Sequence, residues 1–450
     1  MDKTYERVST ITLAEHRGRA RVYLQAQYLG TNAGFRPGES IAVTCERGRV
    51  TVRLDVAGGD RTVAGKRRGE QVESVIDINS QELTQALQGA EVLELRVRYG
   101  SIEITPARVA RRVAKRVLTA AAVSLFAGGG LMATAAAQAG FEPVAAIEIE
   151  PQYADVYAAN HPRARIYNCS VENAPLAEIA RMGPIGLLEA GIPCQPFSTA
   201  RRLEAGGRKK RDTSLAPEAH ALGDMVFWTL HAAAVLNPAA IVAEETPGFL
   251  APGCGAGWIF RTALERMGYR VEAKVLDPAK EGYGELQSRK RAVIVATTGA
   301  PFRWPAPEPN LQRTMAEILL DPDDPRCEWF DESTKPWFFR HAERHRERGN
   351  GFGNVLEIRA ADPWCPTITK RYFALRGGSP VAVHPGKDGA YRFLTIPEVV
   401  ALTGLPQDYA LPASKTVAGE VMGQGVLIGF FRRIFEAVRG QQAARRCGVA

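Results

Sequence analysis

Apolar and polar residues alternate along much of the first hundred positions, with the period of two that is typical of β-strands. The alternation runs through residues 41–54 and again through residues 93–104, and a single glycine interrupts each stretch, at positions 48 and 100. Glycine permits the tight turn of a hairpin. We therefore predict two hairpins within a β-rich N-terminal domain at residues 1–105, and a duplicated small β unit is one interpretation of it.

After a basic linker at residues 106–117, short apolar runs alternate with Ala-rich helical stretches. The linker is either a solvated connector or a segment that contacts phosphates through its Lys and Arg side chains. Strands that alternate with helices indicate an α/β protein with a doubly wound, mostly parallel sheet. The predicted strands lie at residues 118–126, 143–149, 185–190, 239–244 and 292–297, and the predicted helices include residues 131–139 and 151–160.

One region departs from this pattern. Residues 300–365 are rich in Pro, Trp, Arg and Asp, and we predict an insert with little sheet character. Within it, His341 and His345 are four positions apart, but Glu343 is one place late for an HExxH zinc site and no third ligand is near. We therefore interpret this pair as part of a basic helix face and expect no metal.

The composition sets further limits. The 450 residues are 45% hydrophobic and 24% charged, which is typical of a soluble globular protein of two or three domains. No apolar run approaches the ~18 residues of a membrane span, and the N-terminus lacks the apolar stretch of a signal peptide. Seven scattered cysteines without a CxxC pair argue against a disulfide framework or a zinc site and favour a reducing cytoplasm. The net charge of +8 is compatible with nucleic acid without being diagnostic.

Cys194 stands where the apolar run at residues 185–192 ends and a polar, basic loop begins. A strand that ends in a cysteine delivers the thiol to the rim of a parallel sheet, where open α/β sheets bind their ligands. Most lone cysteines are small core residues or inert surface thiols, so an interpretation as a nucleophile depends on the motifs around it. A free thiol has a pKa near ~8.5, which nearby cations or a helix N-terminus would have to lower.

A glycine-rich turn follows the first predicted strand of this region, in the sequence FAGGGL at residues 126–131. Glycines let a backbone approach a ligand closely. The spacing is not GxGxxG and there is no Walker lysine, which disfavours NAD and ATP. About 20 residues further on, Glu148 ends the next strand, where a carboxylate suits the hydroxyls of a ribose. Together these features favour an adenosine-containing cofactor.

Two other strand ends carry charged residues. Glu244 and Glu245 end the run at residues 239–244, and one buried acid there would protonate or hydrogen-bond a ring nitrogen, unless it is an ordinary helix N-terminal Glu. Arg289 and Arg291 precede the last strand and point to one face of an extended segment. They would hold a carbonyl oxygen and a phosphate, or form a surface charge run.

The loop after Cys194 is basic, with Gly206 and Gly207 as hinges. Such a loop beside a nucleophile would close over DNA, unless it is only a solvated charge run. Its candidate DNA contacts are Arg201, Arg202, Arg208, Lys209, Lys210 and Arg211.

In their order along the chain, these motifs resemble the DNA cytosine-5 methyltransferase family. The blocks span about residues 118–440 and comprise the glycine turn, a strand-end Glu, PCQ at 193–195, the Glu244 motif, QxRxR at 287–291, RFLTxxE at 392–398 and MGQGV at 422–426. The resemblance implies a methyltransferase fold, S-adenosyl-L-methionine as cofactor and a flipped cytosine in double-stranded DNA as substrate. It implies a catalytic domain at 118–299 and 391–440 and a target-recognition region at 300–390.

The resemblance also implies roles for single residues. Cys194 would attack carbon 6 of cytosine and Glu244 would hold or protonate ring nitrogen 3. Arg291, with Arg289 near it, would bind the carbonyl oxygen, and Glu148 would bind the ribose of the cofactor. The other implied cofactor contacts are Phe126, Gly128, Gly129, Gly130, Leu131, Ile149, Ser170, Val171, Pro193, Gln424 and Val426.

Further implied partners concern DNA. Thr369 and Arg371, at the edge of the target-recognition region, would contact it. Residues 28–39 faintly resemble the opening of AbrB-like and SymE-like β modules, many of which bind DNA, and a structural or oligomerising appendage is the equal alternative. The family implies a cytoplasmic, nucleoid-associated enzyme of bacterial or phage origin without a membrane or metal partner, and it allows a restriction endonuclease as a partner.

Three positions depart from the family pattern. Glu245 and Gln424 each replace an Asn, and Asn168-Cys169-Ser170 stands where an adenine-contacting Asp is expected. A second carboxylate at position 245 would repel its neighbour or be protonated, and it would raise the neighbour's pKa. The alternatives are a slow or inactive copy, the same scaffold acting on RNA or transferring a modified methyl group, and a non-catalytic DNA-binding regulator.

Overall fold

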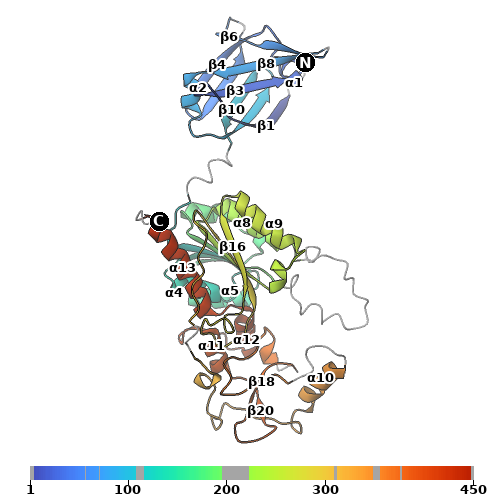
Figure 1. The fold of residues 1–450 in the computed structure, drawn as a ribbon, viewed down its shortest axis with the longest axis vertical. Helices are drawn as coiled ribbons and strands as arrows, with labels where there is room; N and C mark the ends of the chain where they lie inside the picture. Colours follow the sequence, from blue (N-terminus) through green and yellow to red (C-terminus); the bar gives the residue numbers. More distant parts are fainter. Residues whose placement is uncertain are drawn as a thin grey trace. The chain divides into compact units, whose positions relative to one another are not determined.

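The computed structural model describes residues 5–55, 57–69, 71–107, 116–194, 222–308, 312–347, 355–374 and 378–446, and it describes only the backbone of residues 345 and 442–446. The chain divides into two compact units, Met1–Lys115 and Arg116–Ala450 (Figure 1). The basic linker lies largely outside the described residues, so its role stays a prediction. None of the described helices is long and apolar enough to cross a membrane.

The first unit consists of two antiparallel sheets around one apolar core. The six-stranded sheet has the order β1-β9-β10-β5-β4-β6 and contains β1 (Glu6–Thr12), β4 (Ser40–Glu46), β5 (Arg49–Leu54), β6 (Arg61–Thr62), β9 (Val92–Arg98) and β10 (Ser101–Pro106). The four-stranded sheet has the order β2-β3-β8-β7 and contains β2 (Ala14–His16), β3 (Arg19–Ala26), β7 (Ala64–Arg68) and β8 (Gln71–Asn79). The helices of this unit are α1 (Gln27–Thr31) and α2 (Gln81–Ala86).

Both predicted hairpins are present in this unit. β4 pairs with β5, and β9 pairs with β10, in antiparallel register. Gly48 and Gly100 have φ angles of 77° and 70°, a region that glycine adopts without strain. The two hairpins are neighbours in one sheet, because β10 also pairs with β5.

The second unit is built around a seven-stranded sheet with the order β13-β12-β11-β14-β15-β17-β16. Its first five strands are parallel, whereas β17 runs antiparallel to β15 and β16. The prediction of a doubly wound, mostly parallel sheet is therefore confirmed. The strands are β11 (Ala121–Leu125), β12 (Glu142–Ile147), β13 (Arg165–Tyr167), β14 (Leu187–Gly191), β15 (Ala240–Glu245), β16 (Arg270–Leu276) and β17 (Arg291–Thr297).

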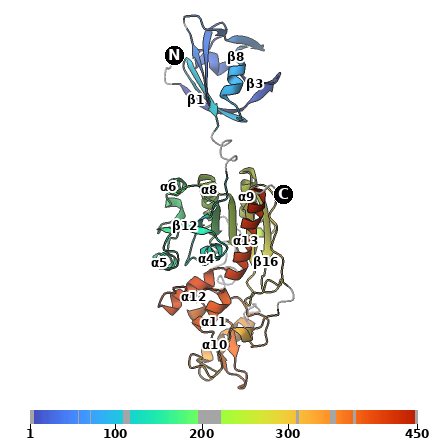
Figure 2. The ribbon, with the colours of Figure 1, turned by 90° about the vertical axis from the view of Figure 1, so that its left-hand side faces the viewer.

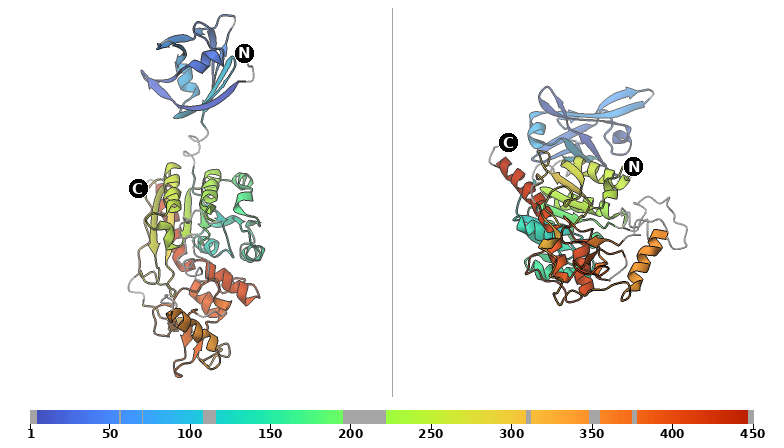
Figure 3. Two further views of the ribbon diagram at one scale, coloured as in Figure 1. Left: turned by 90° about the vertical axis from the view of Figure 1, so that its right-hand side faces the viewer. Right: turned by 60° about the horizontal axis from the view of Figure 1, so that its bottom comes forward.

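Helices cover both faces of this sheet (Figure 2), as two further views also show (Figure 3). Ala122 and Val123, adjacent in β11, belong to the two different cores that these helices form with the sheet. This burial on both sides explains the continuous apolar runs of the strands. One face is covered by α4 (Leu131–Gln138), α5 (Pro151–Asn160) and α13 (Ile428–Arg446), and the other by α6 (Leu176–Ile179), α8 (Met225–Leu236) and α9 (Gly255–Arg266).

The predicted insert contains short elements. β18, β19 and β20 form a small three-stranded sheet, of which only β18 lies within residues 300–365. The elements of the insert and of the segment that follows it are η6 (Met315–Glu317), α10 (Pro336–Glu347), β18 (Glu357–Ile358), η7 (Tyr372–Ala374), β19 (Val381–Val383) and β20 (Tyr391–Arg392). The remaining elements of the second unit are η2 (Val171–Asn173), η3 (Ala180–Met182), η5 (Pro247–Leu250), α11 (Ile396–Thr403) and α12 (Lys415–Gln424).

A buried ion pair accounts for the RFLTxxE motif. Both terminal nitrogens of Arg392 donate to the Glu398 carboxylate, over 2.8 and 2.7 Å. Thr395 caps α11, and its backbone N–H donates to the same carboxylate over 2.7 Å. These residues join β20 to α11, so this motif ties the sheet of β18, β19 and β20 to that helix.

Candidate active site

The strand order places the candidate site at the boundary between β11 and β14. From β11 the chain continues to β12 and β13 on one side of the sheet, and later to β14 and β15 on the other. Such a reversal opens a crevice at the carboxyl ends of the strands, where doubly wound sheets bind ligands. The glycine turn follows β11, Glu148 follows β12, Cys194 follows β14 and Glu244 lies in β15. One edge of the sheet therefore carries all of these residues.

The glycine turn follows a backbone path that excludes side chains. Gly128 and Gly130 have φ angles of 55° and 92°. A Cβ atom on Gly129 would lie 2.4 Å from Val421 Cγ1, and one on Gly130 would lie 2.9 Å from the Tyr157 ring. The turn thus needs glycine for its conformation at positions 128 and 130 and for space at 129 and 130.

Three side chains hold the carbonyl oxygens of this turn. Thr134 Oγ1 donates to the Gly130 carbonyl oxygen over 2.9 Å, and His161 Nε2 lies 3.3 Å from the same oxygen. Tyr409 Oη donates to the Gly129 carbonyl oxygen. Because these contacts fix the carbonyl groups, the turn is preorganised before any ligand binds.

Glu148 lies beside the turn, with both carboxylate oxygens bonded to backbone N–H groups. Oε2 accepts from Gly128 over 2.7 Å and Oε1 accepts from Glu150 over 2.8 Å. Burial raises the pKa of Glu148, while these two hydrogen bonds lower it. Each carboxylate oxygen has a second lone pair, so Glu148 retains the capacity to accept from hydroxyl groups.

The residues around Glu148 form a partly apolar wall. Ile149 is 60% exposed, which is unusual for a large apolar side chain. Asn168 Nδ2 donates to the backbone carbonyl groups of Glu148 and Ile149, over 2.8 and 3.0 Å. Val171 is buried and Ser170 is half-buried next to it. The Asn168 amide therefore fixes the end of β12 at the position where the sequence lacks the expected Asp.

A segment from the far end of the chain completes this side of the site. Gln424 Nε2 lies 3.7 Å from the position of a Cβ atom on Gly128. Leu131 Cδ2 lies only 2.4 Å from the corresponding position on Gly425. Residues 424–426 therefore pack against the glycine turn, and this contact brings the two ends of the second unit together.

Cys194 lies directly after β14, one strand away from Glu244. Gly191 pairs with Glu244 in parallel register, and the Ile192 N–H donates to the Glu244 carbonyl oxygen over 3.1 Å. On its other side β14 pairs with β11, the strand that leads into the glycine turn. The thiol, the acid and the turn therefore lie on three adjacent strand ends.

Cys194 is exposed, and opposing charges act on its thiol. Desolvation by the surrounding protein raises the pKa of Cys194, and the carboxyl groups of Glu245 and Glu244 act in the same direction. Arg291 and Arg289 lower this pKa. Activation of the thiol therefore depends on the charge of the two acids relative to the two guanidinium groups.

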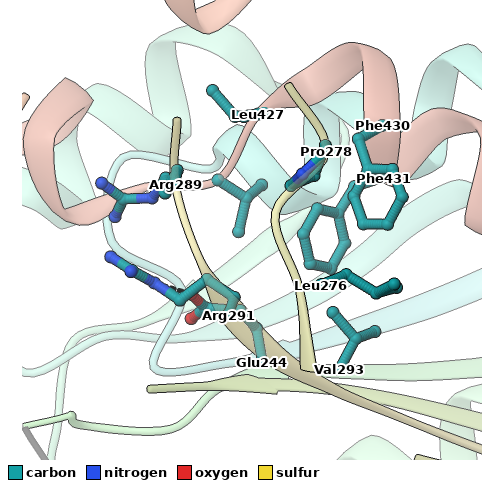
Figure 4. A pocket seen from close by; sticks show the side chains of 10 residues that line it. Glu244, Leu276, Pro278, Arg289, Arg291, Val293, Leu427, Phe430 and Phe431 are labelled. Carbon is teal, nitrogen blue, oxygen red and sulfur yellow. Dashed lines mark ion pairs between the residues drawn. The ribbon is translucent and has the colours of Figure 1, made fainter. Parts of the chain in front are cut away.

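Glu244 and Arg291 form an ion pair in which Arg291 Nε lies 2.6 Å from Glu244 Oε1. A small pocket lies beside this pair. Figure 4 shows the Arg291 and Arg289 side chains on one side of the pocket and the rings of Phe430 and Phe431 on the other. The site thus combines a charged edge with an apolar wall.

Glu245 is fully buried, although its neighbour Glu244 carries the ion pair. Its Oε2 accepts from the N–H and from Oγ1 of Thr246, and within the described residues its Oε1 has no hydrogen-bond partner. Burial, together with the charge of Glu244, raises the pKa of Glu245 to about 8. Of the two predicted outcomes at this position, the structure favours a protonated carboxyl group at neutral pH.

Arg289 is 4% exposed and bonded to backbone carbonyl groups. Its terminal nitrogens donate to the carbonyl oxygens of Ile368 and Gly423, over 3.3 and 3.1 Å. Burial and the charge of Arg291 lower its pKa. The side chain therefore ties residues 368 and 423 to the site, and this geometry lends no support to the predicted phosphate contact.

A model of the C-5 cytosine-specific DNA methylase family matches residues 120–440. The match includes every strand end described above. The chain belongs to this family.

This DNA methylase is similar to bacterial type II methyltransferases. It is 28% identical over 333 residues to type II methyltransferase M.NlaX of Neisseria lactamica, and this alignment covers 72% of this chain and 97% of that protein. It is 28% identical over 326 residues to M.DsaV of Dactylococcopsis salina, which covers 69% and 84%. The solved structure of S. pombe Dnmt2 methyltransferase aligns with a TM-score of 0.53 and 17% identity, covering 73% of this chain and 99% of that one, and shows a shared fold.

The predicted DNA contacts of this DNA methylase fall into two groups. Thr369 and Arg371 are exposed and follow Ile368, which accepts the Arg289 hydrogen bond. The loop residues Arg201, Arg202, Arg208, Lys209, Lys210 and Arg211 lie outside the described residues.

Among the residues that the structure describes, no group of three His, Cys, Asp or Glu side chains lies close enough together to hold a metal ion.

Several residues that support the site have no pattern in the sequence that would identify them. Thr134, His161 and Tyr409 look like ordinary helix or loop residues, and only the folded chain places them against the glycine turn. In the sequence, Asn168 stands out only because it belongs to a segment that departs from the family pattern. Asn168 follows β13, a strand of three residues that the sequence pattern does not predict.

Proposed function

We propose that this DNA methylase transfers a methyl group from S-adenosyl-L-methionine to carbon 5 of cytosine in double-stranded DNA, through a covalent bond to Cys194. One observation carries the proposal: an exposed thiol follows the strand between the glycine turn and the Glu244–Arg291 pair. Carbon 5 is inaccessible within a duplex, so the proposal includes rotation of the target base out of the helix.

The proposal explains why the site holds a thiol. Addition of the Cys194 thiolate to carbon 6 forms a C–S bond and moves a ring electron pair towards carbon 5, which becomes nucleophilic. Once carbon 5 holds the methyl group, a base removes the carbon 5 proton. The C–S bond then breaks, the ring double bond returns and the thiolate leaves.

The Glu244–Arg291 pair suits the edge of a cytosine ring. Ring nitrogen 3 and the carbonyl oxygen are neighbours on that edge, and the two side chains are already in contact at 2.6 Å. Glu244 would hold or protonate nitrogen 3 as negative charge develops in the ring, while Arg291 would bind the oxygen. Arg289 would act through the backbone carbonyl groups that it orders.

The residues around the glycine turn fit S-adenosyl-L-methionine. The turn presents backbone without side chains, Glu148 keeps acceptor capacity for ribose hydroxyls, and exposed Ile149 offers an apolar surface for an adenine ring. When bound, the cofactor would supply an electrophilic methyl group by cleavage of its S–CH3 bond and would leave as the neutral thioether S-adenosylhomocysteine. Gln424 and Pro193 would orient it from the two other sides of the crevice.

Binding of duplex DNA would depend on positive charge outside the pocket. The six basic residues between positions 201 and 211, with Thr369 and Arg371, are the proposed contacts, since Lys and Arg release counterions from the phosphate backbone. A DNA-binding role of the first unit, a restriction endonuclease partner and a cytoplasmic, nucleoid-associated location are expectations that follow from this function.

Methylation assays on duplex DNA and on tRNA, with mass analysis of the product base, test the proposal. We expect 5-methylcytosine in DNA alone. A modified base in RNA, or a heavier group on cytosine, would instead support an altered substrate or transferred group. Bisulfite mapping of DNA from cells that express this chain would then give the recognition sequence, and specific DNA binding without any methylation would support a non-catalytic regulator.

A further inference from the structure

Glu189 is a buried acid that the proposed mechanism does not use. It lies in β14 and is 2% exposed, between the core residues Leu188 and Ala190. Within the described residues, the hydroxyl of Ser124 is the group that hydrogen-bonds its carboxyl, and burial raises its pKa to about 8. An acid buried without a basic partner is costly, and such groups concentrate at functional sites.

Glu189 lies in one of the two strands that border the ligand crevice. Glu189 pairs with Ser124 across β14 and β11, the two strands at which the strand order reverses. Gly191, two residues on, lies on the same face of the strand. It has no side chain, and a Cβ atom there would meet nothing closer than the Phe126 carbonyl oxygen at 3.9 Å. On this face of β14, no side chain therefore lies between Glu189 and the end of the strand.

Glu189 is also connected to the glycine turn. Ser124 Oγ lies 2.9 Å from Tyr157 Oη. The Tyr157 ring lies against Gly130, where it leaves no room for a Cβ atom. A chain of polar groups thus runs from Glu189 through Ser124 to Tyr157, and the ring of Tyr157 packs against the turn on which the cofactor would rest.

We propose that Glu189 is a further cofactor-binding residue, which pairs with the positive charge of the methionyl end of S-adenosyl-L-methionine. This inference rests on the proposed function, because it requires that cofactor. The cofactor carries two cationic groups, an ammonium and a sulfonium, and either would supply the missing counter-charge. A carboxyl that is neutral in the free protein would ionise on binding and pass its proton to the buffer.

Isothermal titration calorimetry of the full chain in two buffers of different ionisation enthalpy tests this at pH 7. With S-adenosyl-L-methionine, we expect release of close to one proton, seen as a buffer-dependent binding enthalpy. Glu189→Gln should lose most of this release and bind about 10- to 100-fold more weakly. S-adenosylhomocysteine retains the ammonium but lacks the sulfonium, so an equal loss with both ligands identifies the ammonium and a loss with the first alone identifies the sulfonium.

Two control variants separate contact from support. Tyr157→Phe removes the hydroxyl next to Ser124 but keeps the carboxyl, and Glu245→Gln removes a different buried acid with a raised pKa. Both should retain the proton release. If Tyr157→Phe abolishes it as fully as Glu189→Gln does, Glu189 only supports the turn and the proposal is wrong.

The outcome in the unmodified protein is decisive even if Glu189→Gln does not fold. Cofactor binding without proton release overturns the inference about Glu189 and leaves the proposed function intact. A complete lack of cofactor binding contradicts the proposed function itself. The two failures are therefore distinguishable in one titration.

Discussion

On the proposed cofactor side of the site, Glu148 accepts two backbone hydrogen bonds and the carbonyl groups of the glycine turn are held by Thr134, His161 and Tyr409. On the proposed nucleophile side, two polar atoms are buried and, within the described residues, without a hydrogen-bond partner. These atoms are Glu245 Oε1 and Arg289 Nε. The two sides share one sheet edge but differ in how completely their polar groups are satisfied.

This difference separates a preformed cradle from a reactive centre. A cradle built from backbone groups and their partners keeps its shape in the free protein. Buried polar atoms without partners cost free energy, of the order of 1–3 kcal/mol each, and that cost is common at functional sites. We therefore expect variants on the cofactor side to change binding, and variants on the nucleophile side to change the rate of the chemical step.

The largest effect is expected for Cys194→Ser. Without the thiolate the ring is not activated, so methyl transfer should fall by roughly 10⁴-fold or more. A denaturation-resistant adduct with DNA that contains 5-fluorocytosine should form with the unmodified protein and vanish in the variant, as gel electrophoresis would show. The calorimetric affinity for the cofactor should stay within about twofold. Unchanged adduct formation would show that Cys194 is not the nucleophile.

Substitutions of the neighbouring acids Glu244 and Glu245 distinguish a chemical role of the carboxyl group from an effect of its burial. Glu244→Gln should lower the single-turnover rate of methyl transfer by about 10²- to 10³-fold, because the group that holds or protonates ring nitrogen 3 is lost. Glu245→Gln should cost much less at pH 7, since burial already keeps that carboxyl protonated. Equal losses in the two variants would contradict the assignment of the acid.

On the cofactor side, Glu148→Gln should weaken cofactor binding by about 10- to 100-fold, because a charged acceptor for the ribose is lost. At saturating cofactor, the single-turnover rate should be nearly unchanged. Glu150→Gln is the control, because this exposed neighbour keeps its backbone N–H bond to Glu148 in the variant, and it should have little effect. A lower single-turnover rate of Glu148→Gln at saturating cofactor would show that this side also affects the chemical step, which would contradict the distinction between the two sides.

The smallest effect concerns stability. Glu245 has a folded pKa of about 8 against an ordinary value of 4.5, so the folded protein retains a proton that the unfolded chain releases between these values. The free energy of unfolding should therefore fall as the pH rises through this window. Urea titrations from pH 5 to pH 9 should show a shallower fall in Glu245→Gln, and an identical slope would place Glu245 in a solvated environment.

Much of the site could be predicted from the sequence because its parts follow strand ends. The glycine turn, Glu148 and Cys194 each come directly after an apolar run, and parallel strands bring their carboxyl ends to one edge. β16 was not predicted, because charged residues interrupt its sequence RVEAKVL. The side-chain environment of Arg289 was also not foreseen, because its two carbonyl partners are 79 and 134 positions away.

By itself, the sequence determined most strands of the second unit, the family and the residue types of the proposed reaction, because each depends on local pattern and motif spacing. Only the tertiary structure decided which charges are compensated. Tyr409 meets the carbonyl group of Gly129 across 280 positions, and Glu189 meets Ser124 across two strands. Burial, which sets the protonation of Glu189 and Glu245, arises when distant segments pack together, so no local stretch of the chain encodes it.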